Sequence, residues 1–455
     1  MYEKCKETTR KLLQYCKKFY MNGEALIEYI EFKPILNVTS YKRTVEKKKK
    51  NYRDFINKIF PGIKSTPEFL DLVYFLSKRS EFQTYYSGKL LATDGTIIKH
   101  PNSKDIEPWL GEFVKSILIN YLEENNSFNF NSKNFSKIYH SLKIHLQNFD
   151  KKYYFVALYN FKGNFPSANL KKNLAIGKCS QEEFSKIANM NTLEGRRKIP
   201  PFHMWKVRYV LRGRFLDDNG SANLKAEKEF LKILETFRLF QEGNIQLGSI
   251  FQYSTGKWDL EHQVSQKIIL PLTDESLYYT LSNDKISIFK KFLKNYAKQN
   301  FEGKTLNFIS TAVRRFNSAI ESEYFEDKVT NCVICLESLL LEDEGELKFR
   351  LATRLAYLLA NNDREREFLW KFTTECYKLR SRIVHGKPRK KFQIDGKEFT
   401  NSQIIKKLAD IVRKTIQAIL ILIKKYKNQI KLLQKLDEGI VNSYKMKILQ
   451  SSIYK

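Results

Sequence analysis

The residues best suited to chemistry in this 455-residue sequence stand together at positions 380–386, Arg-Ser-Arg-Ile-Val-His-Gly. Histidine can take up or release a proton near neutral pH, and arginine presents a planar fork of donors that matches phosphate oxygens. This combination suits acid–base chemistry on a phosphate group. Arg380 and His385 are therefore the candidates for this chemistry, with Ser381 and Arg382 beside them.

A helix must position this motif. Apolar residues recur before it at steps of three and four: Phe368, Leu369, Phe372, Cys376, Leu379 and Ile383. That spacing predicts an amphipathic helix with one buried face. Gly386 and Pro388 predict the end of the helix at His385, because glycine adopts the left-handed C′ conformation easily and proline cannot continue a helix.

With Tyr377 in front of it, the motif resembles the signature of HEPN domains, in particular the Apea-like branch, where an arginine precedes a histidine at a helix end. Two upstream segments, Leu336–Leu341 and Glu346–Leu359, resemble the two preceding helices of the same family. The resemblance covers roughly residues 305–427. It implies a ribonuclease that needs no metal or other cofactor, in which two HEPN domains pair around one cleft and the RNA 2′-OH attacks the adjacent phosphate.

The resemblance also implies a role for each residue of the motif. His385 would be the general acid or base, Arg380 would hold the phosphate and its developing charge, and Ser381 would orient either of them. Donors aimed in advance at developing charge usually supply the largest catalytic contribution, which is consistent with this role for Arg380. Proteins of this kind act as toxins or abortive-infection effectors against phage, so a phage component or a regulatory protein is a possible trigger.

Helix geometry adds a constraint on this site. Arg380 and His385 lie roughly 140° apart around an ideal helix, whereas Ser381 and His385 share a face. A single motif therefore points its two main groups poorly at one phosphate. Either the last turn is distorted or a second motif completes the site across a dimer interface. The chain contains one such motif, so we expect a homodimer formed through the C-terminal helices.

Charge supports a polyanionic partner. The sequence has 80 Lys and Arg residues against 50 Asp and Glu residues, a formal net charge of +30. Such a balance favours RNA as partner through phosphate neutralisation and steering. The alternative is a Lys-, Asn-, Ile- and Tyr-rich composition that is unrelated to binding.

Arg382 is an RNA-binding candidate, and so are two further sets of cations. Alternation along the strand-like segment Trp205–Phe215 places four of them on one face: Lys206, Arg208, Arg212 and Arg214. Such a face would suit a phosphate backbone, or it is an ordinary solvent face. Arg350 and Arg354, four apart on one helix, would contact RNA or a partner protomer, or would form ion pairs with Glu346 or Glu337.

The patterns along the chain predict a mainly α protein with a smaller α/β part. Residues 1–150 are expected to be mainly helical, with a hairpin around Asp94-Gly95, and the expected helices are Thr9–Met21, Tyr52–Phe60, Phe69–Ser77 and Phe113–Glu123. Residues 151–300 are expected to form a small α/β domain, a sensor or an RNA platform. Its expected elements are strands at Tyr153–Tyr159, Trp205–Phe215 and Gly248–Tyr253 and a helix at Phe230–Phe240.

Residues 301–455 are expected to form an up-and-down helical bundle, HEPN-like by the resemblance, with a C-terminal helical tail at Lys431–Tyr454. Asp363 is a candidate N-cap. The expected helices of the bundle are Leu306–Glu321, Glu326–Leu341, Glu346–Ala360, Arg364–His385 and Gln403–Lys425.

Other chemistry is less well supported. Cys332 and Cys335 have the spacing of a redox or zinc pair, but they fall on an apolar helical stripe without a second pair, so we expect buried core cysteines. We expect no metal site. The longest apolar run, Ile416–Ile423, is too short to span a membrane, and the N-terminus lacks the apolar segment of a signal peptide. A cytoplasmic location is expected.

The resemblance therefore implies a metal-independent endoribonuclease that acts as a homodimer, a toxin or an abortive-infection effector. The alternative is a non-catalytic HEPN module that binds RNA or a protein and uses Arg380 and His385 only as structural or phosphate contacts.

Overall fold

The computed structural model describes residues 1–24, 26, 28–34, 44–87, 90–91, 97–147, 151–189, 207–216, 222–253, 278–297, 306–342, 345–388 and 390–453. The chain is mainly helical with a small antiparallel sheet, as the sequence predicts. It divides into two compact units. The first contains Met1–Tyr159, Pro166–Phe230 and Leu247–Ile269, and the second contains Asn160–Phe165, Leu231–Gln246 and Leu270–Lys455. The region 151–300 thus contributes to both units.

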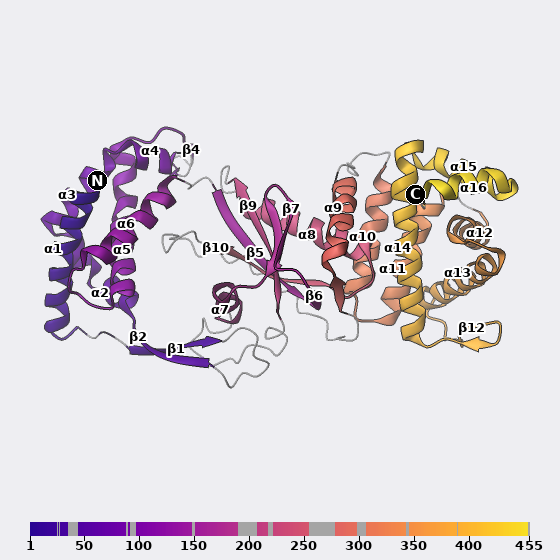
Figure 1. The fold of residues 1–455 in the computed structure, drawn as a ribbon, viewed down its shortest axis with the longest axis horizontal. Helices are drawn as coiled ribbons and strands as arrows, with labels where there is room; N and C mark the ends of the chain where they lie inside the picture. The colour runs from indigo at the N-terminus through magenta and orange to yellow at the C-terminus, as the bar shows by residue number, and fades with distance from the viewer. Residues whose placement is uncertain are drawn as a thin grey trace. The chain divides into compact units, whose positions relative to one another are not determined.

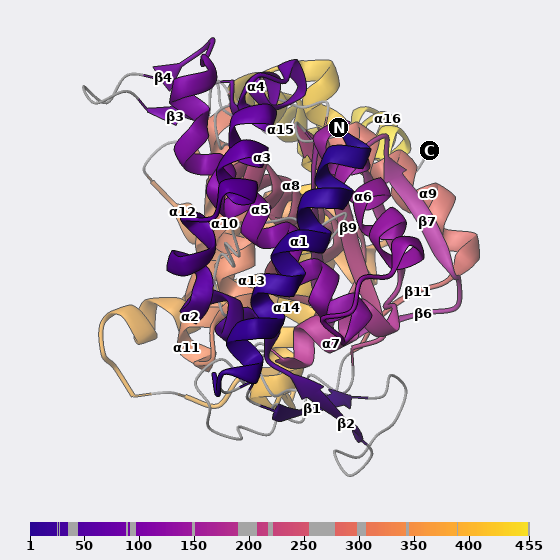
Figure 2. The same cartoon turned by 90° about the vertical axis from the view of Figure 1, so that its left-hand side faces the viewer.

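Helices form the N-terminal part of the first unit: α1 (Tyr2–Met21), α2 (Tyr52–Lys64), α3 (Pro67–Ser77), α4 (Ser80–Tyr86), α5 (Ser103–Asn125) and α6 (Ser132–Gln147). α5 packs against α2, α3, α4 and α6, and Figure 2 shows α1 with α3 to one side and α6 to the other. Four of these helices were predicted, and α4 and α6 were not. Ile56, Leu72 and Leu118, from three different helices, are buried in their common core.

Two short hairpins accompany these helices. β1 (Glu28–Pro34) pairs antiparallel with β2 (Thr44–Lys50), a pairing the sequence analysis did not predict. β3 (Leu90–Leu91) pairs antiparallel with β4 (Ile97–Ile98), which confirms the arms of the predicted hairpin. Its Asp94-Gly95 turn lies outside the described residues.

A five-stranded sheet in the order β10-β5-β9-β8-β7 follows. Its strands are β5 (Lys151–Tyr159), β7 (Ser167–Lys171), β8 (Leu174–Lys178), β9 (Tyr209–Leu216) and β10 (Gln246–Tyr253). The predicted alternation along β9 is confirmed, because Tyr209, Leu211 and Phe215 are buried. Val210 breaks the alternation because it packs with Phe184 of α7 (Gln181–Asn189) in a small second cluster.

The second unit contains α9 (Asn283–Ala297), α10 (Asn307–Glu321), α11 (Phe325–Leu340), α12 (Leu347–Leu359), α13 (Asp363–Val384), α14 (Asn401–Tyr426), α15 (Gln429–Val441) and α16 (Ser443–Ile453) (Figure 1). α8 (Ala222–Phe240) spans the two units. A short parallel pair, β6 (Phe161–Gly163) and β11 (Tyr279–Leu281), also belongs to the second unit. All five predicted bundle helices are present. They share one core, to which α11, α12 and α14 contribute Leu336, Leu355 and Ile416.

Local capping explains two corrections. α13 is capped by Asn362, whose side chain accepts the Glu365 N–H at 2.9 Å, and not by Asp363. The tail is two helices and not one, because the Asn442 side chain accepts the backbone N–H of Tyr444 at 3.1 Å and so starts a new helix there. Asparagine is a strong N-cap because its side-chain oxygen satisfies N–H groups of the first turn.

A small hairpin after α13 was not predicted. β12 (Gln393–Ile394) and β13 (Lys397–Glu398) are joined by Asp395 and Gly396, both with positive φ (49° and 78°). Two-residue hairpin turns of this kind favour Asp-Gly because both positions need the left-handed region. The hairpin lies beside α13 (Figure 1).

All six cysteines are free and buried, which confirms the prediction for Cys332 and Cys335. Among the described residues, no helix combines the length and the apolar character that crossing a membrane requires.

Candidate active site

The motif lies where α13 ends. The N–H of Lys387 donates to the carbonyl of Arg382 at 2.9 Å, the N–H of Gly386 donates to the carbonyl of Ile383 at 3.1 Å, and Gly386 has φ +61°. This pair of bonds is the Schellman arrangement with glycine at C′, as the sequence predicts. The last turn is therefore regular and not distorted. Arg380 and His385 consequently point in different directions from one helix, roughly 140° apart.

Arg380 faces α11. Its Nη2 lies 3.7 Å from Oε2 of Glu337, and the two side chains are 26% and 19% exposed. The Nε of Arg380 is buried without a hydrogen-bond partner among the described residues. A guanidinium carries five N–H donors, so one long ion pair leaves most of its donor capacity unused.

Glu337, Tyr377 and Arg380 form one electrostatic cluster between α11 and α13. Burial raises the pKa of Glu337, and the charge of Arg380 opposes that shift. Burial also raises the pKa of Tyr377, helped by the charge of Glu337 and opposed by that of Arg380. Arg380 is thus the cation that keeps a carboxylate tolerable in a half-buried position. From the sequence, Glu337 is expected only as a partner of Arg350 or Arg354.

His385 is the C-cap residue of α13, and its side chain is exposed. Val384 beside it is 55% exposed, and Ser381 is half-buried one turn earlier. Arg382 is half-buried, and its Nη1 donates to the carbonyl of Pro388 at 3.0 Å. Arg382 thereby ties the segment after the helix to the last turn, a structural contact that the sequence analysis did not predict.

The chain after His385 is also fastened to the middle of α13. The rings of Phe392 and Phe399 lie 5.4 and 6.1 Å from the ring of Phe372. Lys371 donates to Oδ1 of Asp395 at 2.6 Å. The segment that follows His385 is therefore anchored both at the helix end and at the β12–β13 hairpin, and this anchoring holds the backbone at His385 in place.

Arg354 is not an RNA contact, and that prediction is wrong. Its side chain is 4% exposed, and its Nε and Nη2 donate to Asp437 on α15 at 2.8 and 2.6 Å. Its Nη1 donates to the carbonyl of Leu340 at 2.7 Å. The alternative of an ion pair is correct in kind, but the partner is neither Glu337 nor Glu346. Arg350 is half-buried on α12 and stays a candidate.

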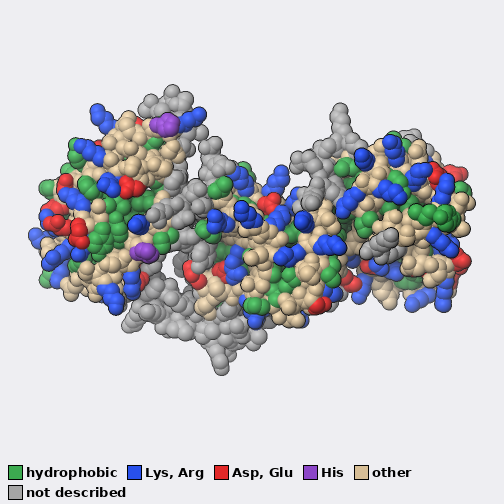
Figure 3. Space-filling view, turned by 45° about the horizontal axis from the view of Figure 1, so that its top comes forward, with side chains coloured by type: hydrophobic (Ala, Val, Ile, Leu, Met, Phe, Trp, Pro, Cys, Tyr) green, Lys and Arg blue, Asp and Glu red, His purple; other side chains and the backbone are tan. Residues whose placement is uncertain are grey.

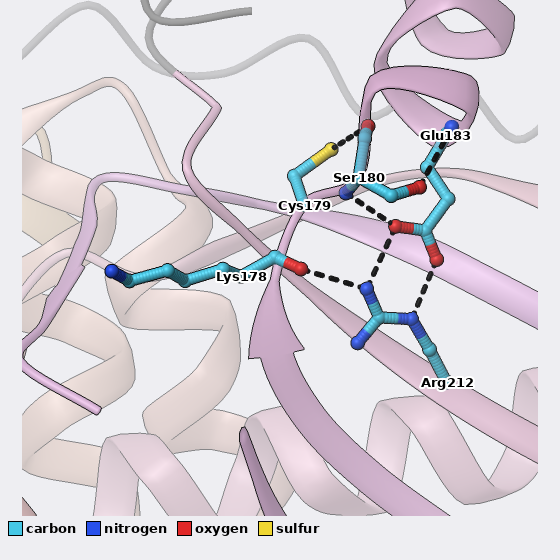
Figure 4. A network of polar contacts seen from close by, with 5 residues as sticks. All are labelled: Lys178, Cys179, Ser180, Glu183 and Arg212. Atoms are coloured by element: carbon cyan, nitrogen blue, oxygen red, sulfur yellow. Dashed lines mark hydrogen bonds and ion pairs between the residues drawn. The ribbon is translucent and has the colours of Figure 1, made fainter. Parts of the chain in front are cut away.

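Two of the cations on the predicted face of β9, Arg208 and Arg212, also form hydrogen bonds within the chain. Arg212 makes a two-pronged pair with Glu183, Nε to Oε1 at 2.6 Å and Nη2 to Oε2 at 2.7 Å, and its Nη2 also donates to the carbonyl of Lys178 at 2.7 Å (Figure 4). Glu183, 3% exposed, also accepts the N–H of Ser180 at 2.8 Å. Ser180 Oγ accepts the N–H of Glu183 in return, at 3.2 Å, which completes a capping box on α7.

Arg212 is therefore a structural residue of the sheet, whereas the sequence analysis placed it among the RNA contacts. Arg208 is half-buried and donates to the carbonyl of Val207 at 3.1 Å. Arg214 is exposed, with its guanidinium 6.0 Å from the centre of the Tyr153 ring. Lys206 lies outside the described residues. Among the described members of the set, Arg214 is the one that remains open to a phosphate.

Surface charge is distributed. On the face drawn in Figure 3, Lys and Arg side chains are spread over the helices of the second unit, with acidic side chains among them. In the described part of the chain, no three His, Cys, Asp or Glu residues are grouped as ligands of a metal ion.

Comparison of the chain with protein-family models, with curated proteins and with solved structures found no match.

Proposed function

We propose that this protein is a metal-independent endoribonuclease in which His385 and Arg380 act on a phosphate of RNA. The observation that carries the proposal is the exposed His385 at a regular, anchored helix end, on the helix whose Arg380 retains unused donors beside Glu337. The succession of α11, α12 and α13, with the motif at the end of α13, agrees with the order that the resemblance to HEPN domains implies.

The chemistry follows from the residue types. The imidazole of one His385 takes the proton of the ribose 2′-OH, and the 2′-oxygen attacks the adjacent phosphorus. The bond from phosphorus to the 5′-oxygen breaks, and the leaving oxygen takes up a proton from a protonated His385 imidazole. The products are a 2′,3′-cyclic phosphate and a 5′-hydroxyl end. Arg380 would bind the non-bridging oxygens as their charge grows, and Ser381, on the His385 face, would orient the imidazole or the phosphate.

The regular last turn favours a site built from two copies of the chain. Arg380 and His385 diverge on one helix, so two motifs facing one cleft would let an arginine and a histidine meet at one phosphate. The proposal therefore includes a homodimer formed through the C-terminal helices. A role as a cytoplasmic toxin or abortive-infection effector, with residues 1–300 controlling cleavage in response to a phage or protein trigger, belongs to the same proposal.

The test is cleavage of total cellular RNA by the purified full chain in EDTA. We expect His385→Ala to lower the rate by roughly 10²- to 10⁴-fold, the usual contribution of general acid–base catalysis. His140→Ala is the matched control, because His140 is also an exposed histidine on a helix. Fragments should carry 2′,3′-cyclic phosphate. Cleavage by His385→Ala at the rate of the unmodified chain would remove His385 from the mechanism.

One observation favours the second candidate, a non-catalytic module that binds RNA or a protein. Arg380 is paired with Glu337 and its Nε is buried, an arrangement that would also suit a purely structural arginine. Such a module would bind RNA in EDTA and leave it intact with and without His385.

A further inference from the structure

A cavity of about 1080 Å³ lies in the second unit, between the start of α12, the middle of α13 and the β12–β13 hairpin. That volume is slightly above the range of small-molecule sites, roughly 300–1,000 Å³. None of the candidate catalytic residues lines it. It is therefore a feature to explain separately from the motif.

Aromatic side chains form part of its wall. Phe349 is 54% exposed on the first turn of α12, and its ring lies 6.4 Å from that of Trp370, at 73° to it. The Nε1 of Trp370 donates to Oγ1 of Thr353 at 3.2 Å, which fixes the orientation of its ring. Tyr377 adds a third ring to the lining. Rings held in place and open to solvent on one side can stack on flat ligands.

The charges around the cavity are balanced. Lys378 donates to Glu375 at 2.6 Å, and Lys371 donates to Asp395 at 2.6 Å, and all four residues line the cavity. The remaining lining cation, Lys348, is exposed. A wall whose cations are mostly paired does not suit a phosphate cluster or an acidic peptide. It suits a flat, uncharged group with hydrogen-bonding edges.

A buried hydroxyl in the lining lacks a partner. Thr374 is 7% exposed and lines the cavity, and its Oγ1 makes no hydrogen bond within the described part of the chain. Burying a hydroxyl without a partner costs free energy, on the order of 1–3 kcal/mol, and a polar ligand atom within reach of Thr374 would offset that cost. Thr373 has the same kind of unpartnered hydroxyl but does not line the cavity.

The cavity and His385 share one face of α13. Thr374, Tyr377 and Lys378 lie on the lining, and steps of three and four residues continue that stripe through Ser381 to His385. Lys378 and His385 are seven residues apart, which corresponds to about 11 Å along the helix. At a stacked spacing of about 3.4 Å per nucleotide, roughly three nucleotides would bridge the cavity and His385.

We propose that this cavity holds an unpaired nucleobase of the RNA strand that reaches His385, stacked on Phe349, with one edge against the Trp370 ring and its polar edge toward Thr374. The inference rests on the proposed function and deepens it, because it names the substrate as RNA that is single-stranded a few nucleotides from the cleavage point. A base inside a duplex is stacked on its neighbours and cannot enter.

The test is binding of a short single-stranded 2′-O-methyl oligoribonucleotide to the full chain in EDTA, followed by fluorescence anisotropy. The methylated strand cannot be cut by 2′-OH attack, so binding is measured independently of cleavage. Phe349→Ala should weaken binding roughly 5- to 150-fold, the effect of losing one stacked base at about 1–3 kcal/mol. Phe349→Trp, which keeps an aromatic ring at this position, should bind the strand as tightly as the unmodified chain. Tyr324→Ala, at an aromatic that is 69% exposed and outside the cavity, should leave it unchanged.

A second pair of variants tests the hydroxyl. Thr374→Val should weaken binding of the same strand, and Thr373→Val should not. The strand annealed to its complement should bind more weakly and should not respond to Phe349→Ala. Unchanged binding by Phe349→Ala, or an equal loss with Tyr324→Ala or with the duplex, would overturn the proposal. Failure of the His385→Ala cleavage test would instead count against the proposed function and leave this binding result intact.

Discussion

Arg380→Lys separates a catalytic arginine from a structural one. Lysine keeps a positive charge that can still reach Glu337, but it loses the planar fork that binds two phosphate oxygens at once. The existing pair is a single contact at 3.7 Å between partly exposed side chains, and pairs of this kind contribute about 0–1 kcal/mol. We therefore expect a small change in the free energy of unfolding. The rate of RNA cleavage should fall by roughly 10²- to 10³-fold, as when one oriented donor to a developing charge is removed.

The assay combines urea unfolding with cleavage under single-turnover conditions. Arg366→Lys is the matched control, because Arg366 lies on the same helix, forms an ion pair with Asp363 and is remote from the motif. It should change neither quantity by much. Cleavage by Arg380→Lys at the original rate would show that the fork is not used. A loss of several kcal/mol of stability in that variant would show that Arg380 belongs to the packing between α11 and α13.

Two further predictions concern the second unit. Asp437→Ala should destabilise the chain by about 3–5 kcal/mol, because it leaves Arg354 buried without its counter-charge. Arg354→Met should cost less stability, since the freed Asp437 is 48% exposed and can be hydrated. Urea unfolding that ranked the two variants in the opposite order would refute this prediction. Burial raises the pKa of Glu337, so this carboxyl group binds a proton more readily in the folded chain than in the unfolded chain. The stability that this proton contributes is present at acid pH and is lost as the pH rises through the folded-state pKa. The free energy of unfolding of the unmodified chain should therefore rise relative to that of Glu337→Gln as the pH falls from neutral towards the ordinary pKa range of a glutamate. The rise should be steeper when both chains also carry Arg380→Ala. Equal pH profiles would contradict a raised pKa at Glu337.

Local pattern predicted the elements that carry the motif. The apolar stripe of α13 and its Gly386 stop signal depend on neighbours within a few residues, so both could be predicted from the sequence. The stripe Phe135, Ile138 and Leu142 on α6 carries the same signal, although α6 is not among the expected helices. The Asp-Gly pair at 395–396 was likewise a usable hairpin signal, although its arms are only two residues long.

Long-range pairing could not be predicted. Arg354 and Asp437 are 83 residues apart and Arg212 and Glu183 are 29 apart. Nothing in the sequence around a cation says whether a distant carboxylate will neutralise it. The RNA-contact predictions failed at these two arginines for that reason. The cavity beside α13 also depends on segments that meet only in three dimensions.

The hydrogen-bonded C-terminal end of α13 has a consequence for how the proposed enzyme would be activated. Gly386 and Arg382 already fix the backbone around His385 within one chain. Each copy would therefore contribute its half of the site in a folded form, and no segment around His385 would have to fold when two copies associate. Activity at low abundance would then rise with the square of the protein concentration. A cell could hold the protein silent by keeping it scarce or its copies apart, and a trigger would need only to bring two together.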